Sequence, residues 1–294
     1  MTIKAYQSLS EKVISEVLNL ESVCIDHDNL KGSLFLEPSL NVDPTIKSFF
    51  LMYEKGELIS MISMFIPTKH EAEISAYTLP KFRKQGYFKT LLTNAVNELK
   101  RFNISDILFV SEKTSISGRK VLKALDAKYE HTEYFMRFNK ARYVSMETYR
   151  LLYRKAEIED LEKTIATSMK IFDDSYEDSK ALLEKCFGTE TREQYLALLN
   201  HEIIGIGSLN LEGEDVSIFG LGLISEYRGK GYGKELLHLM IDNLLLRGRT
   251  DLTIVVNSEN INALGLYQQT GFRIDVAYEY YRKKVSELVP LLGE

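Results

Sequence analysis

Three glycines within five positions, at 229, 231 and 233, form the segment of this chain best suited to chemistry. Glycine has no Cβ, so the backbone can turn tightly and come close to a ligand. A strongly periodic helical pattern follows, and a helix N-terminus offers free amide hydrogens and a positive dipole end to a phosphate. Arg228 and Lys230 add positive charge. The segment is a candidate pyrophosphate cradle, with a plain strand-to-helix turn as the alternative.

Spacing excludes two familiar nucleotide motifs. In a P-loop, Lys is followed by a hydroxyl residue that reaches a metal ion, but Glu235 follows Lys234 here. A dinucleotide fingerprint reads G-x-G-x-x-G, whereas this segment reads G-x-G-x-G. The segment resembles instead the R-x-x-G-x-G loop of the GNAT superfamily of N-acetyltransferases, which binds the pyrophosphate of acetyl-coenzyme A (acetyl-CoA). The resemblance places these residues at the cofactor: Leu223, Ile224, Arg228, Gly229, Lys230, Gly231, Tyr232, Gly233 and Lys234.

A second motif downstream strengthens the resemblance. In this superfamily a strand is followed by N-x-x-A-x-x-x-Y on a helix that ends at Gly-Phe. Asn260, Ala263 and Tyr267 match the first part, and Gly271 and Phe272 match the second. The resemblance implies that Asn260 binds the cofactor arm and that Tyr267 protonates the leaving sulfur, since a phenol with a pKa of about 10 keeps its proton at neutral pH. Helix capping by Asn260 and aromatic packing by Tyr267 are the alternatives.

The implied reaction is direct transfer of an acetyl group from acetyl-CoA to a primary amine of a small molecule or peptide in a ternary complex. Positioning supplies much of the rate. Splaying of the central strand would let backbone groups near Leu223 pair with the pantetheine arm and polarise the carbonyl, and Gly222 suits such a distortion. No general base can be named. The candidates are turn residues that are more often simply exposed, namely His201, Glu212, Glu214 and Asp215.

The resemblance places the acceptor pocket between the first two helices of this half and the loop that joins them. We expect these helices at Ile158–Phe172 and Tyr176–Phe187, followed by a hairpin that turns at Asn200-His201. The candidate acceptor-binding residues are Asp173, Asp174 and Tyr176. Carboxylates in this loop could hold an amine, and a polar loop facing water is the alternative.

The chain repeats itself with an offset of 145 residues, the difference between Arg228 and Arg83. At this offset Gly86 falls on Gly231, and the apolar pattern of the following helix also recurs. A repeat this long indicates domain duplication. We therefore predict an α/β (α+β, mixed-sheet) fold: two tandem GNAT-like domains, residues 1–142 and 148–294, each a mostly antiparallel central sheet flanked by helices with splayed central strands.

The first copy is degraded where the chemistry would be. Phe88 replaces Gly233 and Gln85 replaces Lys230, and no N-x-x-A-x-x-x-Y motif follows. We therefore assign the cofactor site to residues 148–294. A two-site enzyme is a second interpretation. The third is a non-catalytic acyl-CoA sensor or interaction protein on the same fold, because fold alone does not give function.

Composition limits the remaining classes. The chain has 294 residues, 45% apolar and 27% charged, as expected of two globular domains. Cys24 and Cys186 are the only cysteines, which gives no disulfide framework and no metal-binding spacing. No apolar run approaches the length of a membrane span, and basic patches for nucleic acid are missing. We expect a cytoplasmic monomer or homodimer without a metal, a membrane or a nucleic-acid partner.

Overall fold

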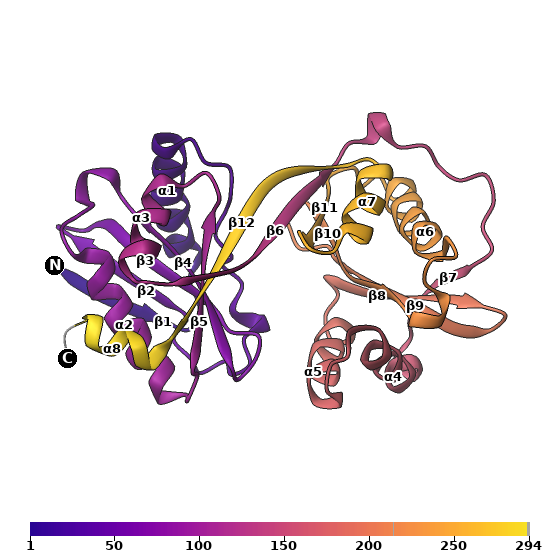
Figure 1. The fold of residues 1–294 in the computed structure, drawn as a ribbon, viewed down its shortest axis with the longest axis horizontal. Coiled ribbons are helices and arrows are strands. Elements are labelled where there is room, and N and C mark those ends of the chain that lie inside the picture. Colours follow the sequence, from indigo (N-terminus) through magenta and orange to yellow (C-terminus); the bar gives the residue numbers. More distant parts are fainter. Residues whose placement is uncertain (214, 293–294) are drawn as a thin grey trace. The chain divides into compact units, whose positions relative to one another are not determined.

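The computed structural model describes residues 1–213 and 215–292 (Figure 1). The chain forms two compact units. Unit 1 comprises Met1–Glu133 with Val276–Glu294, and unit 2 comprises Tyr134–Asp275. Each unit is a mixed sheet with helices packed on it, so the predicted fold class, two tandem α/β domains, is confirmed.

The sheet of unit 1 has the strand order β1-β2-β3-β4-β5-β12. Its neighbours pair antiparallel, except for β4 and β5, which are parallel. The helix α1 packs on β3 and β4, whereas α2 packs on β2 and β3 and against α8. The strands are β1 (Thr2–Tyr6), β2 (Phe49–Glu54), β3 (Glu57–Phe65), β4 (Glu71–Thr78), β5 (Asp106–Glu112) and β12 (Phe272–Lys284). The helices are α1 (Glu11–Asp28), α2 (Tyr87–Arg101), α3 (Ile116–Ala124) and α8 (Val285–Leu292).

The sheet of unit 2 has the strand order β6-β11-β10-β9-β8-β7. Here β10 and β11 form the parallel pair, and β7, β8, β9 and β10 pair antiparallel in succession. The strands are β6 (Lys128–Phe138), β7 (Leu152–Lys155), β8 (Arg192–Leu199), β9 (Glu202–Asn210), β10 (Val216–Leu223) and β11 (Leu252–Asn257). The helices are α4 (Leu161–Phe172), α5 (Tyr176–Phe187), α6 (Tyr232–Leu246) and α7 (Ile261–Gln269).

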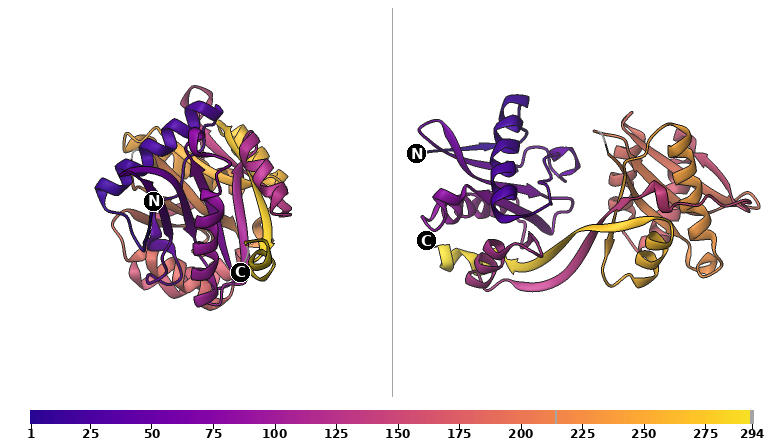
Figure 2. Two further views of the ribbon diagram at one scale, coloured as in Figure 1. Left: turned by 90° about the vertical axis from the view of Figure 1, so that its left-hand side faces the viewer. Right: turned by 90° about the horizontal axis from the view of Figure 1, so that it is seen from above.

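The last strand of the chain completes the sheet of the first unit. From Tyr278 to Lys284, β12 pairs antiparallel with β5, and the amide of Val285 donates to the carbonyl of Ser105 at 2.8 Å. Leu288 in α8 is fully buried in the first core. Figure 2 shows this segment, in yellow, among the indigo and purple elements near the N-terminus. The units therefore divide the chain differently from the expected domains at 1–142 and 148–294.

Several expected elements of unit 2 are present. The helix expected at Tyr176–Phe187 is α5, and the one expected at Ile158–Phe172 begins with a 3-10 turn before α4. The hairpin of β8 and β9 turns at Asn200 and His201, which both have positive φ, of 50° and 69°. This conformation matches the twist of the strands that it joins.

Both parallel pairs are splayed, as predicted. Pairing of β4 with β5 ends at Ile74, and pairing of β10 with β11 ends at Ile218. Each central strand continues for four or more residues beyond that point while paired on its other side only. Backbone groups that face the resulting gap therefore have no strand partner there.

The two central strands, β4 and β10, differ in one inserted residue, which β10 has and β4 lacks. In β10, Phe219 is opposite Ser208 but Gly222 is opposite Ile206, so β10 carries an extra residue in a bulge. Gly220, in the bulge, has a φ of 56°, which favours glycine. In β4 the pairing with β3 is regular throughout. The bulge distinguishes the second copy from the first at the strand where the chemistry is expected.

Candidate functional site

The glycine loop joins β10 to α6. Gly229 has a φ of 74°, and Gly231, with a φ of 88°, is the N-cap residue of α6. These left-handed conformations favour glycine at both positions, since a Cβ is strained there. The first amides of α6 have no acceptor within their own helix and point out of its N-terminus. The sequence prediction of a glycine loop at a helix N-terminus is thus reproduced by the structure.

Gly233 lies in the first turn of α6, and its own packing does not demand glycine. A Cβ there would be 3.7 Å from Leu223 Cδ1 and 3.8 Å from Leu266 Cδ2, which are ordinary contacts. Its φ is not positive either. The fold therefore has room for a Cβ at this position.

The two cations of the loop differ in what they contact. Arg228 donates from Nε to the carbonyl of Leu223 and from Nη2 to that of Ile171, both at 2.9 Å. Its guanidinium thus ties the loop to the end of β10 and to α4. Lys230 places Nζ 5.7 Å from the centre of the Tyr227 ring. The side chain of Lys230 is the freer of the two to meet an anion.

The end of β10 is held closely by its neighbours. Leu223 and Ile224 are buried, and the Ile224 amide donates to Ile204 at 2.9 Å. A Cβ on Gly222 would lie 2.2 Å from Ile171 Cγ2, so close packing of α4 on the strand explains that glycine. The backbone distortion expected at Gly222 occurs at Gly220 instead, because the bulge needs a positive φ there.

The downstream motif residues lie on α7. Asn260 is its N-cap residue, and its Oδ1 accepts from the Ala263 amide at 3.1 Å. The capping role is thus present, and the amide nitrogen of the same side chain is left for another acceptor. Tyr267 is 6% exposed and packs near Phe272, with the ring centroids 6.2 Å apart. Burial raises the pKa of Tyr267 to about 12, so its phenol remains protonated at neutral pH.

The candidate acceptor residues lie between α4 and α5. Asp173 is the left-handed C-cap of α4, and Tyr176 opens α5 and donates to the carboxylate of Glu162 at 3.3 Å. Asp174 lies between them, and burial, followed by the charges of Asp178 and Asp173, raises its pKa. All three candidates are exposed on the surface, so they are open to a cationic acceptor and to water alike.

The structure singles out no general base. His201 is exposed in the tight turn, and Asp215 is held in an ion pair with Arg137 at 2.7 Å. The exposed Glu212 lies in the next turn, where its amide donates to Asn210 Oδ1. Glu214 lies outside the described residues. In the described part of the chain, no group of His, Cys, Asp or Glu side chains is arranged to hold a metal ion, and no helix is long and apolar enough to cross a membrane.

Sequence reasoning did not single out Arg150, which comes just before β7. Arg150 lies on the segment that connects the two copies, and its Nη2 donates to the carbonyl of Lys230 at 3.1 Å. Its guanidinium stacks over the Tyr232 ring at 4.2 Å from the centroid. The only available signal was Glu235, a charged residue beside the apolar pair Leu236-Leu237.

The first copy keeps the loop conformation but differs in side chains. Gly86 caps α2 with a φ of 85°, and Lys84 has a φ of 62° where the second copy has Gly229. Arg83 donates to the Thr78 carbonyl at 2.9 Å, as its counterpart does in unit 2. The degradation expected from the sequence thus affects the side chains and the regular strand β4, not the course of the loop.

The backbone of residues 31–33 binds to side chains at the end of β5 and on β12. Glu112, the last residue of that strand, accepts from the amides of Lys31 and Gly32, both at 2.9 Å. The Ser33 amide donates to the Tyr278 hydroxyl at 3.1 Å. A Cβ on Gly32 would lie 2.4 Å from that hydroxyl, so the fit is tight. The Glu112 carboxylate and the Tyr278 hydroxyl therefore accept hydrogen bonds from the chain's own backbone at this end of unit 1.

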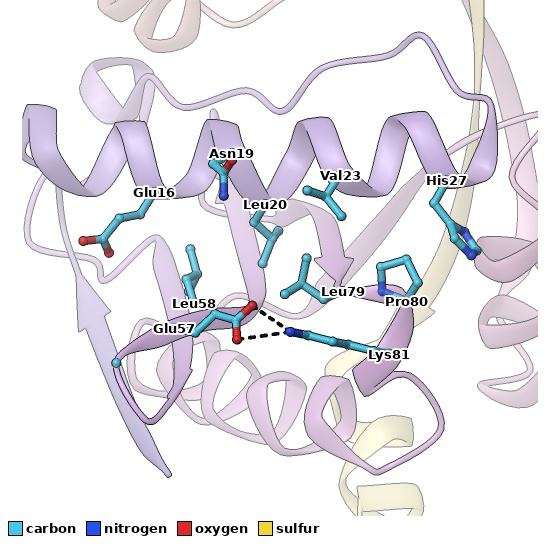
Figure 3. Close-up of a pocket in the computed structure, with 11 residues that line it drawn as sticks. Glu16, Asn19, Leu20, Val23, His27, Glu57, Leu58, Leu79, Pro80 and Lys81 are labelled. Carbon is cyan, nitrogen blue, oxygen red and sulfur yellow. Dashed lines mark hydrogen bonds and ion pairs between the residues drawn. The ribbon is translucent and has the colours of Figure 1, made fainter.

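A separate hollow of about 650 Å³ lies in unit 1 between α1 and the residues around β3 and β4 (Figure 3). Its floor is apolar and includes Leu20, Leu58 and Leu79. Lys81 and Glu57 form an ion pair at 3.0 Å on its rim. None of the predicted site residues lines this hollow.

Comparison with known proteins identifies the family. The model of the acetyltransferase (GNAT) family matches residues 16–121 and 155–272. The [ribosomal protein bS18]-alanine N-acetyltransferase of Haemophilus influenzae is 32% identical over 114 residues, which are 36% of this chain and 77% of that protein. This chain belongs to the GNAT acetyltransferase family and is an acyltransferase, as predicted.

Solved structures agree on the fold over the whole chain. A GCN5-related N-acetyltransferase from Sphaerobacter thermophilus aligns with a TM-score of 0.78 at 16% identity and covers 96% of each chain. A tandem GNAT protein from the clavulanic acid biosynthesis pathway aligns with a TM-score of 0.70 at 10% identity, covering 97% of this chain and 99% of that one. The tandem arrangement is thus shared with solved structures.

Proposed function

We propose that this protein transfers an acetyl group from acetyl-CoA to a primary amine of a peptide or small molecule, at a site in unit 2. The observation that carries the proposal is the glycine loop at the N-terminus of α6, directly after a strand that is both bulged and splayed. Family membership supports the reaction class, and this geometry supports the proposed location.

Several features of the loop favour the binding of a diphosphate. The free amides of α6, its dipole and Lys230 all favour negative charge at this point. Because a Cβ at position 233 would make only ordinary contacts within the protein, we attribute the missing side chain to close approach of the ligand to the backbone. Leu223, Ile224, Gly229, Gly231, Tyr232 and Lys234 complete the proposed cofactor site, with Arg228 holding the loop.

The gap beside β10 suits the extended pantetheine arm that carries the thioester. Beyond Ile218 the strand has unpaired backbone groups on the side of β11, which an amide-bearing arm can pair with as an added strand would. The bulge at Gly220 changes the direction of the amides that follow it, so that one of them can face the thioester oxygen. Asn260 has an amide nitrogen available for the same arm.

The proposed reaction is acetyl transfer, with no oxidation or reduction. The amine nitrogen forms a bond to the acetyl carbon, the bond from that carbon to sulfur breaks, and the amine proton goes to solvent. Tyr267 gives its phenolic proton to the leaving sulfur and recovers it from water. Since Tyr267 remains protonated well above neutral pH, it is suited to this role.

The acceptor is proposed to be a peptide amine, with a small-molecule amine as the second candidate. The relative from Haemophilus influenzae is named for acetylation of an alanine of a ribosomal protein, and its match favours a peptide. Asp173, Asp174 and Tyr176 present carboxylates and a ring at the surface beside α4, which suits a cationic acceptor.

The test is thiol release by the full chain with acetyl-CoA and a panel of amines that includes alanine-initiated peptides and polyamines. Mass spectrometry should show one added acetyl group on the acceptor. Tight acetyl-CoA binding without turnover on any amine would favour the alternative, a non-catalytic acyl-CoA sensor. A chain that neither binds nor turns over acetyl-CoA would contradict the proposal.

A further inference from the structure

The segment that connects the two copies is fastened along one face of α6. Tyr143 donates to Asp242 Oδ1 at 2.7 Å, and Ser145 and Tyr149 donate to the other oxygen of the same carboxylate. His238 Nδ1 lies 3.1 Å from the Tyr143 hydroxyl. His238 and Asp242 are one turn apart along the helix, so the segment contacts a single face of α6.

The segment ends at a buried carboxylate in the first turn of α6. Glu235 is 1% exposed, and its Oε1 accepts from the amides of Arg150 and Leu151. The Arg150 Nε pairs with its Oε2 at 3.1 Å. A carboxylate at a helix N-terminus that holds a diphosphate would repel it unless a cation neutralises the carboxylate. Thr90 occupies the equivalent position in the first copy, so this device belongs to the second copy alone.

The guanidinium of Arg150 reaches past its carboxylate to the glycine loop. Its Nη2 donates to the carbonyl of Lys230 and lies 3.3 Å from the position that a Cβ of Gly231 would take. Its Cζ lies over the ring of Tyr232, the first residue of α6. The side chain is 55% exposed, and within the described residues no hydrogen bond occupies Nη1. One face of this fixed cation is therefore open beside the N-terminus of α6.

We infer that Arg150 is a phosphate-binding residue of the cofactor site, contributed by the segment that connects the copies. The inference rests on the proposed function, because it takes the glycine loop to be the cofactor cradle. Arg150 donates to a phosphate of coenzyme A through its open side, and Glu235 positions it. The phosphate is one of the diphosphate group or the 3′-phosphate of the same cofactor.

The experiment measures the dissociation constant of coenzyme A for the full chain by titration calorimetry. Arg150→Gln should weaken binding by about 10- to 100-fold, the range expected for a charged hydrogen bond to phosphate. Arg150→Lys should recover only part of this loss, because an ammonium cannot reproduce the forked geometry. Unchanged affinity in Arg150→Gln would overturn the inference.

A double variant separates phosphate contact from mere neutralisation. Arg150→Gln combined with Glu235→Gln removes both charges and leaves no buried unpaired carboxylate, so it should unfold close to the wild-type temperature. Its coenzyme A affinity should remain about tenfold or more below wild type. A double variant with wild-type affinity would show that Arg150 only cancels Glu235, and would overturn the inference.

Truncated ligands identify the phosphate. S-acetyl-N-acetylcysteamine is a thioester without phosphate. At a low concentration of this thioester, turnover by Arg150→Gln should equal turnover by the wild type. With dephospho-coenzyme A, a retained penalty assigns the contact to the diphosphate, and a lost penalty assigns it to the 3′-phosphate. An equal penalty on the phosphate-free thioester would overturn the inference. Wild-type chain that binds coenzyme A but acetylates no amine would instead refute the proposed function alone.

Discussion

Arg228 donates from Nε to the carbonyl oxygen of Leu223 at 2.9 Å. Arg83 makes the same bond to Thr78, also at 2.9 Å, in the first copy. Strand end, loop and helix start are therefore joined in the same way in both halves of the duplicated chain. What differs is a side chain at the helix start, Phe88 in place of Gly233, and the bulge, which β4 lacks. The framework is duplicated, whereas the bulge and the glycine at the second position of the helix are present in the second copy alone.

Gly233→Phe gives the second copy the residue that the first copy has at the equivalent position, Phe88. A ring at the first turn of α6 should block the amides proposed to hold the diphosphate, and acetyl-CoA affinity should fall by more than about 100-fold. The fold should be unchanged, because a Cβ at this position makes only ordinary contacts and α2 carries Phe88 at the equivalent place. Calorimetric titration and circular dichroism check both parts. Undiminished affinity would remove the loop from the site.

The reverse substitution, Phe88→Gly, should not create a second site. It clears the start of α2, but β4 remains regular, and Glu112 still holds the backbone of Lys31 and Gly32. Titration with acetyl-CoA should therefore give one site per chain for this variant, as for wild type. A stoichiometry of two would mean that Phe88 alone keeps the first copy from binding.

Motifs and periodicity were sufficient for much of unit 2. The helix α5 begins and ends where the sequence predicts, because Ser175 and Gly188 are recognisable caps. The turn at Asn200 was readable for a similar reason, since Asn tolerates a positive φ. The glycine loop and α7 were found through family motifs. All these signals are local in the sequence.

The features that the sequence did not reveal depend on non-local pairing. The bulge at Gly220 is one extra residue, and only the register against β9 exposes it. The pairing of β12 with β5 has no local signal, because a strand pattern does not name its partner. Arg150 stands alone in a connecting segment without periodicity. Its role becomes visible only through the buried Glu235, which the fold brings to it.

Gly220→Ala tests the bulge. Alanine at a φ of 56° costs about 1 kcal/mol, and its Cβ would lie 3.3 Å from Ser208 Oγ, so the strand should flatten. Turnover should fall by about tenfold or more, while coenzyme A affinity, to which we propose that the glycine loop also contributes, should fall less than turnover. Gly248→Ala is the matched control, because that glycine has a φ of 75° with no atom within 4 Å of its Cβ position. Equal turnover in both variants would argue against a catalytic bulge.

Glu73→Gln tests whether the Glu73 carboxyl makes the stability of unit 1 depend on pH. Burial, followed by the charges of Glu133 and Glu71, raises the pKa of Glu73 to about 8. The folded state therefore binds this proton more tightly than the unfolded chain, and the contribution to stability falls as pH rises from about 4.5 towards 8. The variant removes this loss. Scanning calorimetry should show a midpoint raised by about 2–4 °C at pH 8 and no gain at pH 4. A gain of equal size at both values would mean that the carboxylate does not titrate in this way.

Tyr267→Phe separates proton donation from packing. The variant keeps the ring that packs near Phe272 and removes only the hydroxyl, so the unfolding midpoint and acetyl-CoA affinity should stay at wild-type values. Turnover should fall by about 100-fold if the hydroxyl protonates the leaving sulfur. Because burial holds the pKa of Tyr267 at about 12, the wild-type rate should show no alkaline decline from this group up to about pH 10. Single-turnover measurements at saturating acetyl-CoA isolate the chemical step from product release. Equal rates for the two proteins would assign Tyr267 to the core and leave the sulfur to be protonated by water.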